Sequence, residues 1–322
     1  MKKQTRSLIA AAAVLAVLGG ALLALSGREE TDETGLEIAG LADFPATGMR
    51  ITNEAGTLEF NQTDGTWTCA DDPACPVDSE RVQALVESLT ALTASRALET
   101  PDADADYGLD DPDYVVTLSD EDGALALRAS LADAATYVKS SAGDTVYVLT
   151  TALPEALDNA LTDWVAYDTP PYATESEIQS ITWDGTTVAR VPEPADGTDT
   201  DSGSDGETEA PEQWTVTADG ASRTVERSET ITALLDSVRD LYVTGCAGYG
   251  AADDTARAAY GLDNAGAHQL RVTYGTEETQ TYVLRIGSAH ADGYYAMLDD
   301  NGIVLTLDAD AVETLLALHL DA

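Results

Sequence analysis

Two copies of one sequence pattern lie about 150 residues apart in this chain. The segment Tyr107-Gly108-Leu109-Asp110 returns as Tyr260-Gly261-Leu262-Asp263, and Trp67 returns as Trp214. Between the tryptophan and the tyrosine of each copy, a Ser-Glu pair precedes five apolar residues at the same relative positions. An internal repeat of this length predicts a structural unit that is built twice.

Each copy has the signals of a small sheet followed by a helix. Short alternating segments surround Asp64-Gly65 in the first copy and Asp184-Gly185 in the second, and Asp-Gly is a typical hairpin turn. The apolar residues recur at offsets 0, 3, 4, 7 and 10, which is one face of a helix. Ser79 and Ser228 are candidate N-caps, and Asp78 is the alternative in the first copy. We predict an α+β fold of two tandem repeats, each an antiparallel meander sheet packed with amphipathic helices.

The N-terminal segment, residues 1–27, indicates the compartment. Leu8–Leu25 is an uninterrupted run of 18 apolar or glycine residues behind Lys2, Lys3 and Arg6. A helix of this length just crosses a hydrocarbon core, whereas a cleaved signal usually has a shorter apolar region. We predict one N-terminal transmembrane helix, with a cleaved signal as the alternative. In both cases the basic flank stays inside, so the body is extracytoplasmic, and with the uncleaved helix the protein is a single-pass protein of the cell membrane.

Composition divides the remaining chain. Residues 28–43 are polar and acidic and are predicted to form a stalk. The first repeat is expected at 44–171, with a closing helix near Pro154, and the second at 172–322. Residues 193–212 contain eight acidic and no basic residues, and are expected to form a disordered acidic insertion.

The net charge of −42 excludes some partners. The chain has 58 acidic residues against 16 basic ones. Such a surface repels nucleic acid and anionic lipid headgroups and attracts cations or basic protein surfaces. We therefore expect no nucleic-acid partner.

The three cysteines leave two alternatives open. Cys69 and Cys75 flank a turn-rich stretch, and a disulfide between them is feasible outside the cytoplasm; two unpaired thiols are the other possibility. Cys246 has no evident partner and is expected to be a small buried residue. The three histidines show no ligand spacing with these cysteines, so no zinc site is expected.

One group of aspartates resembles a calcium loop. Asp102, Asp104, Asp106 and Asp113 fall at positions 1, 3, 5 and 12 of the loop count. A calcium loop also needs glycine at position 6, where this chain has Tyr107, and a glutamate at position 12. The second copy does not repeat these carboxylates. An acidic surface loop is the favoured interpretation, and calcium binding is the alternative.

The shared residues favour a structural role. Gly108 and Gly261 permit tight or left-handed turns, and the neighbouring tyrosine, leucine and aspartate can anchor such a turn to the core and backbone. Trp67 and Trp214 are expected to be core or sheet-face aromatics, with stacking on a sugar as the alternative. The usual nucleophile, zinc, phosphate and dinucleotide signatures are missing, so neither a catalytic residue nor a cofactor is predicted.

The order of these features resembles a known family. The chain is similar to the domain-of-unknown-function 4340 family in the order of its motifs. These are a meander with Gly-x-Trp, an amphipathic helix, Tyr-Gly-Leu-Asp-x-Pro, and then strands ending in Tyr-Val or Tyr-Tyr. The resemblance covers most of Met49 to Leu320, although Ala265 stands where the first copy has Pro112. It is carried by Asp64 to Trp67, Tyr107 to Pro112, Thr145 to Leu149, Gly261, Leu262, Gly293 to Tyr295 and Val304.

The resemblance implies an envelope role and no particular chemistry. Members of that family are membrane-tethered bacterial proteins, and some resemble products encoded beside ABC transporter components. We therefore expect a membrane-anchored extracytoplasmic binding or scaffold protein, with an ABC transporter component as its partner. A carboxylate-dependent envelope hydrolase or carbohydrate-binding protein and a calcium-stabilised adhesion module are the alternatives.

Overall fold

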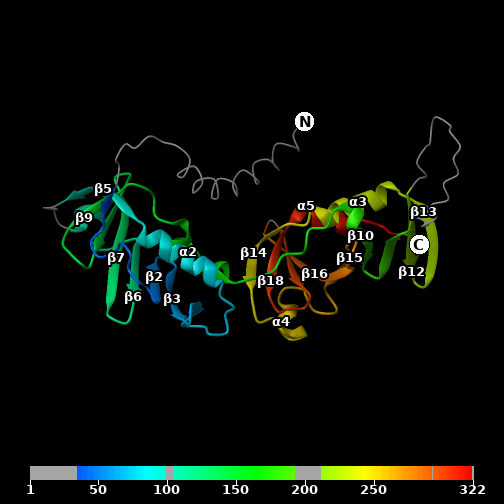
Figure 1. The fold of residues 1–322 in the computed structure, drawn as a ribbon. Coiled ribbons are helices and arrows are strands. Elements are labelled where there is room, and N and C mark those ends of the chain that lie inside the picture. Colours follow the sequence, from blue (N-terminus) through cyan, green and yellow to red (C-terminus); the bar gives the residue numbers. More distant parts are fainter. Residues whose placement is uncertain (1–34, 99–103, 193–211, 292, 321–322) are drawn as a thin grey trace, which may run out of the picture.

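The fold is built from two antiparallel sheets. The computed structural model describes residues 35–98, 104–192, 212–291 and 293–320. Within these residues each sheet has nine strands, and the two sheets lie one beside the other along the length of the molecule (Figure 1). The strands of the first sheet are β1 (Leu36–Glu37), β2 (Gly48–Asn53), β3 (Gly56–Thr63), β4 (Thr66–Cys69), β5 (Thr93–Leu98), β6 (Tyr114–Ser119), β7 (Ala124–Ala132), β8 (Ala135–Ser140) and β9 (Val146–Leu149).

The second sheet uses the C-terminal half of the chain. Its strands are β10 (Ile178–Trp183), β11 (Thr186–Arg190), β12 (Gln213–Ala218), β13 (Ala221–Glu226), β14 (Val243–Gly248), β15 (His268–Tyr274), β16 (Gln280–His290), β17 (Gly293–Leu298) and β18 (Val304–Asp308). The strand order is β1-β5-β9-β8-β7-β6-β2-β3-β4 in the first sheet and β13-β12-β11-β10-β15-β16-β17-β18-β14 in the second. When the second order is read backwards, starting at β14, its first eight strands correspond one by one to the run from β5 to β4 in the first sheet. Strands β1 and β13 are additions at opposite edges.

The predicted Asp-Gly hairpins are present, but they join different strand pairs of the two matching orders. Asp64 and Gly65 have φ angles of 51° and 81°, and they join β3 to β4. Asp184 and Gly185 have φ angles of 45° and 89°, and they join β10 to β11. Two successive positive φ angles give a turn whose twist matches that of paired strands, and aspartate and glycine both tolerate this conformation.

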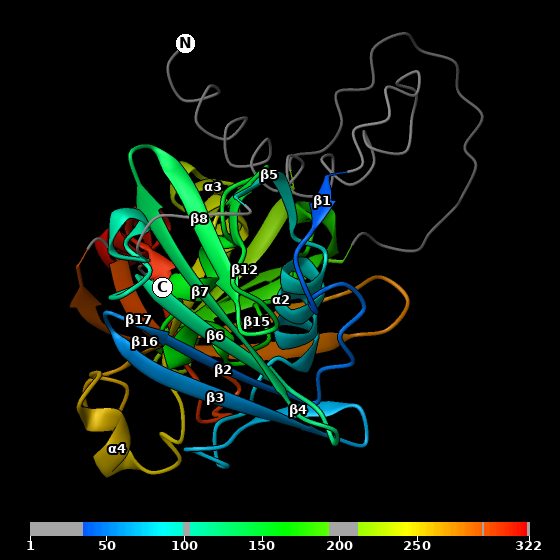
Figure 2. The same ribbon diagram turned by 90° about the vertical axis from the view of Figure 1, so that its left-hand side faces the viewer.

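Two amphipathic helices cover the sheets as the apolar spacing predicts. Helix α2 (Ser79–Thr90) buries Val82, Leu85, Val86 and Leu89, and α3 (Glu229–Arg239) buries Ile231, Leu234, Leu235 and Val238. Ser228 caps α3 by accepting a hydrogen bond from the Ile231 N–H, whereas Asp78 caps α2. The Ser79 hydroxyl instead accepts from the Trp67 N–H at 2.9 Å, which ties α2 to β4. Figure 2 shows α2 beside the first sheet.

The helices are fewer and shorter than an α+β class implies. Besides α2 and α3, the described residues contain α4 (Asp254–Ala258), α5 (Ala309–Ala317) and the 3-10 turns η1 (Asp104–Tyr107), η2 (Glu155–Asp158), η3 (Leu161–Trp164) and η4 (Glu175–Glu177). The closing helix expected near Pro154 is only a 3-10 turn, because the chain there leaves the helical conformation at Asn159. The described fold is therefore mostly β, and the class predicted from sequence is corrected accordingly.

The start of the folded body also differs from the prediction. Strand β1 pairs with β5, and Ile38 and Leu41 are 2% and 0% exposed in the first core. These apolar side chains draw residues 35–43, assigned to the acidic stalk, into the first half of the fold. No helix among the described residues is long and apolar enough to span a membrane. The transmembrane helix predicted within 1–27 and insertion residues 193–211 lie outside the described residues.

Candidate functional site

The two Tyr-Gly-Leu-Asp segments form equivalent turns. Gly108 and Gly261 have φ angles of 72° and 68°, which non-glycine residues rarely adopt. The leucine that follows each glycine, Leu109 or Leu262, is 0% exposed. The glycine thus reverses the chain while the leucine fixes the turn in the core.

Each turn is fastened to the sheet by a tyrosine pair. The rings of Tyr107 and Tyr137 lie 5.0 Å apart in the first half, and those of Tyr260 and Tyr295 lie 5.0 Å apart in the second. Tilted and edge-on aromatic pairs at this separation add to the energy of burial. Both pairs consist of protein side chains packed on each other, which is a structural arrangement.

A serine on a long strand completes each turn. The Ser130 hydroxyl donates to the Gly108 carbonyl at 2.9 Å, and the Ser288 N–H donates to the Tyr260 carbonyl at 2.9 Å. In the second half, the Asp263 carboxylate also accepts the Gly266 N–H at 3.0 Å. These bonds satisfy backbone groups that the turn would otherwise leave unpaired.

Two of the four aspartates that match calcium-loop positions, Asp104 and Asp113, have protein partners. Asp104 accepts two hydrogen bonds from the Lys139 ammonium, at 2.9 and 3.2 Å, and Arg128 lies 4.0 Å away. Asp113 accepts the Leu131 N–H at 2.9 Å, Asp106 is exposed, and Asp102 lies outside the described residues. Across residues 35–98, 104–192, 212–291 and 293–320, no group of three or more metal-ligating side chains is arranged to hold a metal ion.

The tryptophans are buried in the cores. Trp67 is 1% exposed and Trp214 is 0% exposed, while Trp164 and Trp183 are 1% and 6% exposed. The indole N–H of Trp67 donates to Gln83 at 3.0 Å. These rings are core residues, and their faces are not open for stacking on a sugar.

The carboxyl groups with displaced pKa values do not have the signature of a general acid. The Arg227 guanidinium lowers the pKa of Glu175, the Thr174 hydroxyl lowers that of Glu177, and Arg285 lowers that of Asp300. A carboxylic acid that donates a proton near neutral pH needs a raised pKa. These three groups are structural anions.

One histidine forms an oriented pair. His268 Nδ1 lies 2.6 Å from the Asp184 carboxylate, and the Trp183 ring stacks on the imidazole with 5.5 Å between centroids. The pair shares an open hollow with His319 and Thr186. Its two members are 45% and 42% exposed, so solvent weakens their coupling.

The three cysteines gather although they come from both halves. Cys69, Cys75 and Cys246 are free, buried and part of one core cluster. Burial raises the pKa of Cys75 and of Cys246. These are the properties of inert structural thiols rather than of reactive ones.

The cluster marks a packed junction between the halves. Strand β14 of the second sheet contacts η3 of the first half, and this brings Cys246 into the first core. The Tyr249 hydroxyl donates to the Asp72 carboxylate at 2.6 Å. Apolar and polar contacts therefore join the two halves.

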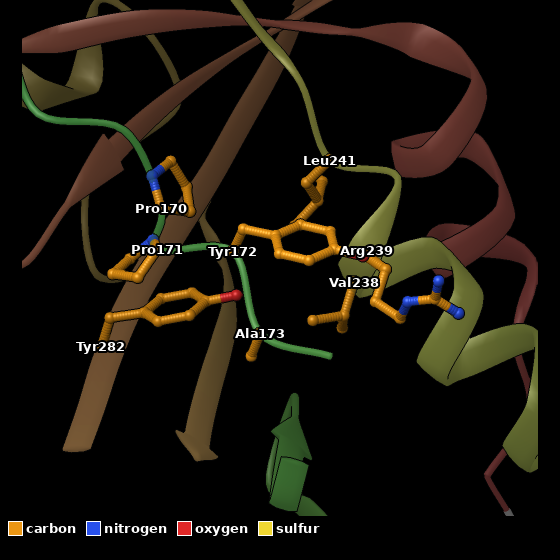
Figure 3. Close-up of a pocket in the computed structure, with 8 residues that line it drawn as sticks. All are labelled: Pro170, Pro171, Tyr172, Ala173, Val238, Arg239, Leu241 and Tyr282. Atoms are coloured by element: carbon orange, nitrogen blue, oxygen red, sulfur yellow. The ribbon is translucent and has the colours of Figure 1, made fainter. Parts of the chain in front are cut away.

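Residues 165–174, between η3 and η4, form the linker between the two halves. A small cavity lies where this linker meets the second half. It has a volume of about 60 Å³, and Figure 3 shows the side chains around it. Its lining consists of Pro170, Pro171, Tyr172, Ala173, Val238, Arg239, Leu241 and Tyr282. The linker supplies one wall, and α3 with the residues after it supplies another.

One wall of the cavity is a buried tyrosine. Tyr282 is 4% exposed, and its hydroxyl points toward Tyr172 and Ala173 (Figure 3). Burial raises the pKa of this phenol. At the rim, the Arg239 guanidinium donates to the Tyr172 hydroxyl, and its Nε is buried without a hydrogen-bond partner.

One residue of the lining is mostly open to solvent. Tyr172 is 71% exposed. Sequence reasoning missed this place, because Tyr282 lies in a strand 110 positions beyond the linker and no local pattern connects the two. The only local signal is the Pro170-Pro171-Tyr172 run.

The comparisons with known proteins identify a family. No curated protein and no solved structure matches this chain. A family model described as a domain of unknown function, DUF4340, matches residues 67–265. The match begins at the first repeated tryptophan and ends just after the second Tyr-Gly-Leu-Asp segment. Because it covers more than half of the chain, this protein belongs to the DUF4340 family.

Proposed function

We propose that this protein is a membrane-anchored, extracytoplasmic binding or scaffold subunit made of two tandem repeats, without catalytic activity of its own. A component of an ABC-type transporter is the proposed partner. The anchor is the apolar run within residues 1–27, which follows a basic flank. The matching strand order of the two sheets supports the duplication.

The packed junction is the main support for a scaffold. Cys246 lies in the core of the opposite half, and Tyr249 bonds to Asp72 across the boundary. Domains connected only by a flexible linker move relative to each other by default, whereas an apolar packed contact restricts that motion. A body with a fixed shape can hold a partner in one orientation.

The proposal is tested by recovering the partner from membranes. Full-length protein is purified at native expression in mild detergent, beside a control bait that keeps residues 1–43 and replaces the rest with an unrelated soluble domain. Enrichment of transporter subunits with the full chain alone is the expected result. Failure to recover any transporter subunit, or equal recovery with the control, contradicts it.

The orientation has its own measurement. Protease added to intact spheroplasts should digest the body of an extracytoplasmic protein and leave only the anchor region protected. A body that stays intact until the membrane is lysed contradicts the proposed topology.

A further inference from the structure

Two of the three buried cysteines lie on one loop at the junction between the halves. Both are free thiols in this structure. We propose that Cys69 and Cys75 form a disulfide when the chain folds in an oxidising compartment, while Cys246 stays a free thiol. The cellular part of this inference rests on the extracytoplasmic placement of the proposed function. The bond closes the loop against which the second half packs.

The first argument is the path of the chain between the two cysteines. Cys69 is the last residue of β4, and the Trp67 N–H of the same strand donates to the Ser79 hydroxyl at 2.9 Å. The chain therefore leaves β4 and returns to it at the start of α2. Inside this loop the chain turns at Asp72, whose carbonyl accepts the Cys75 N–H at 3.0 Å. The loop thus brings both cysteines back to one side of the first half.

The second argument is the shared environment of the two side chains. Cys69 is 1% exposed and Cys75 is 6% exposed, and both belong to the first core. Burial raises the pKa of the Cys75 thiol, and the neighbouring Cys69 raises it further. A buried thiol behaves as a small apolar group with a weak donor, so replacing two thiols with a disulfide leaves no strong hydrogen-bonding group without a partner.

The third argument concerns the choice of partner. The Cys246 thiol already donates to the Gly248 carbonyl at 3.3 Å. It reaches the first core only when β14 of the second half packs against η3. The entropy cost of bringing two residues together grows with the length of chain between them, so Cys75 meets Cys69 before it meets Cys246.

The pairing is an exchange with a disulfide-bearing oxidant. One cysteine thiolate attacks the disulfide of the oxidant and forms a mixed disulfide, and the second thiolate then displaces the remaining thiol of the oxidant. The two cysteines lose two protons and two electrons, and one disulfide of the oxidant becomes two thiols. Disulfides persist outside the cytoplasm. Because the closed core shields both thiols from attack, the exchange takes place before the core closes.

The location of the loop indicates what the bond stabilises. Asp72 lies between the two cysteines, and its carboxylate accepts the Tyr249 hydroxyl of the second half at 2.6 Å. A disulfide restricts the unfolded chain and so favours the folded loop. The bond therefore supports the contact that joins the two halves.

Mass spectrometry of the full-length protein in detergent tests the pairing. The protein is refolded with a mixture of oxidised and reduced glutathione, or with reduced glutathione alone, and then unfolded, alkylated and cut with trypsin. Cleavage after Arg50 and Arg81 gives a peptide of residues 51–81 with Cys69 and Cys75, whereas residues 240–257 carry only Cys246.

After oxidation, the peptide 51–81 should be unlabelled and the peptide 240–257 labelled, whereas both should be labelled after refolding with reduced glutathione alone. Labels on both cysteines of 51–81 after oxidation would refute the proposal, as would a crosslink between the two peptides.

Urea unfolding of matched variants measures the effect of the bond. Each protein is compared in its oxidised and reduced forms, so that the packing cost of an alanine cancels. Reduction of wild type should raise the unfolding equilibrium constant about 50-fold, as expected for a closed loop of seven residues. The control Cys246→Ala should keep this dependence, and the double variant Cys69→Ala/Cys75→Ala should lose it. Equal stability of oxidised and reduced wild type contradicts the proposal.

The outcome is separable from that of the proposed function. If the transporter component is recovered but 51–81 carries two labels both in protein from cells and after refolding with oxidised glutathione, the disulfide is refuted and the function stands. If the disulfide forms in glutathione but protein from cells carries three free thiols, the pairing chemistry stands and the extracytoplasmic placement fails.

Discussion

Replacing Gly261 with alanine tests whether the second Tyr-Gly-Leu-Asp turn needs glycine for space as well as for conformation. Gly261 has a φ angle of 68°, and an added Cβ would lie 2.8 Å from the Ser288 backbone nitrogen and still closer to its hydroxyl oxygen. The matched control is Gly185→Ala in the same half. Gly185 has a φ angle of 89° and no atom within 4 Å of an added Cβ.

The expected costs follow from these two environments. A left-handed alanine costs about 1–2 kcal/mol at either position. At Gly261 the new methyl group must also displace the Ser288 backbone, and overpacking of this kind costs about 1–3 kcal/mol more. We expect Gly261→Ala to lose about 2 kcal/mol beyond the control, which is roughly 30-fold in the unfolding equilibrium constant.

Urea unfolding followed by tryptophan fluorescence measures this difference, because Trp183 and Trp214 are buried in the same half. A second pair of variants, Gly108→Ala and Gly65→Ala in the first half, tests whether the loss of stability follows the crowding around the added Cβ. An alanine Cβ at Gly108 would lie 3.1 Å from the Ser130 Cβ, whereas one at Gly65 meets nothing within 4 Å. The excess cost should therefore be smaller at Gly108 than at Gly261. Equal losses for Gly261→Ala and Gly185→Ala would refute the steric argument and leave only a conformational one.

Three further measurements examine single contacts. In spectrophotometric titration, Tyr114 should ionise with a pKa of about 12, because its hydroxyl donates to the Asp158 carboxylate at 2.6 Å. The stabilisation from this bond is complete below pH about 10 and is lost as the pH rises toward 12. The control variant Asp158→Asn should return the pKa of Tyr114 toward its usual value. Tyr249→Phe should destabilise the junction by about 1 kcal/mol in urea unfolding, whereas an unchanged midpoint would show that its bond to Asp72 contributes nothing. The Arg227 guanidinium lowers the pKa of Glu175, so the ionised carboxylate stabilises the fold above the ordinary glutamate pKa, and this stabilisation is lost as the pH falls. When the pH is lowered from 6 to 4, the free energy of unfolding should therefore decrease less in Glu175→Gln than in wild type.

Local sequence signals predicted local structure well. The Asp-Gly pairs gave the expected hairpins, and the apolar spacing gave the buried faces of α2 and α3. The turn glycines could be recognised because each repeated position needs a positive φ angle, which is a property of a single residue. The burial of Trp67 and Trp214 follows in the same way from their places in alternating segments.

Long-range contacts were not predictable from spacing. Lys139 pairs with Asp104 because β8 lies near η1, and nothing in the aspartate pattern indicates this partner. Cys246 could be recognised as buried, but not as part of the opposite core, because the edge strand that carries it meets η3 only in the assembled fold. The same reason explains why Tyr282 and Pro171 were not connected.

The two halves share most of their turn and core contacts but not the cavity beside Pro170 and Pro171. The turns, tyrosine pairs and buried tryptophans occur in both halves, and their interactions are used within the fold. The linker that passes Pro170 and Pro171 occurs once in the chain, so the cavity it forms with Tyr282 also occurs once. The cavity is therefore a product of the connection between the two halves, and the duplication of the sheet does not account for it.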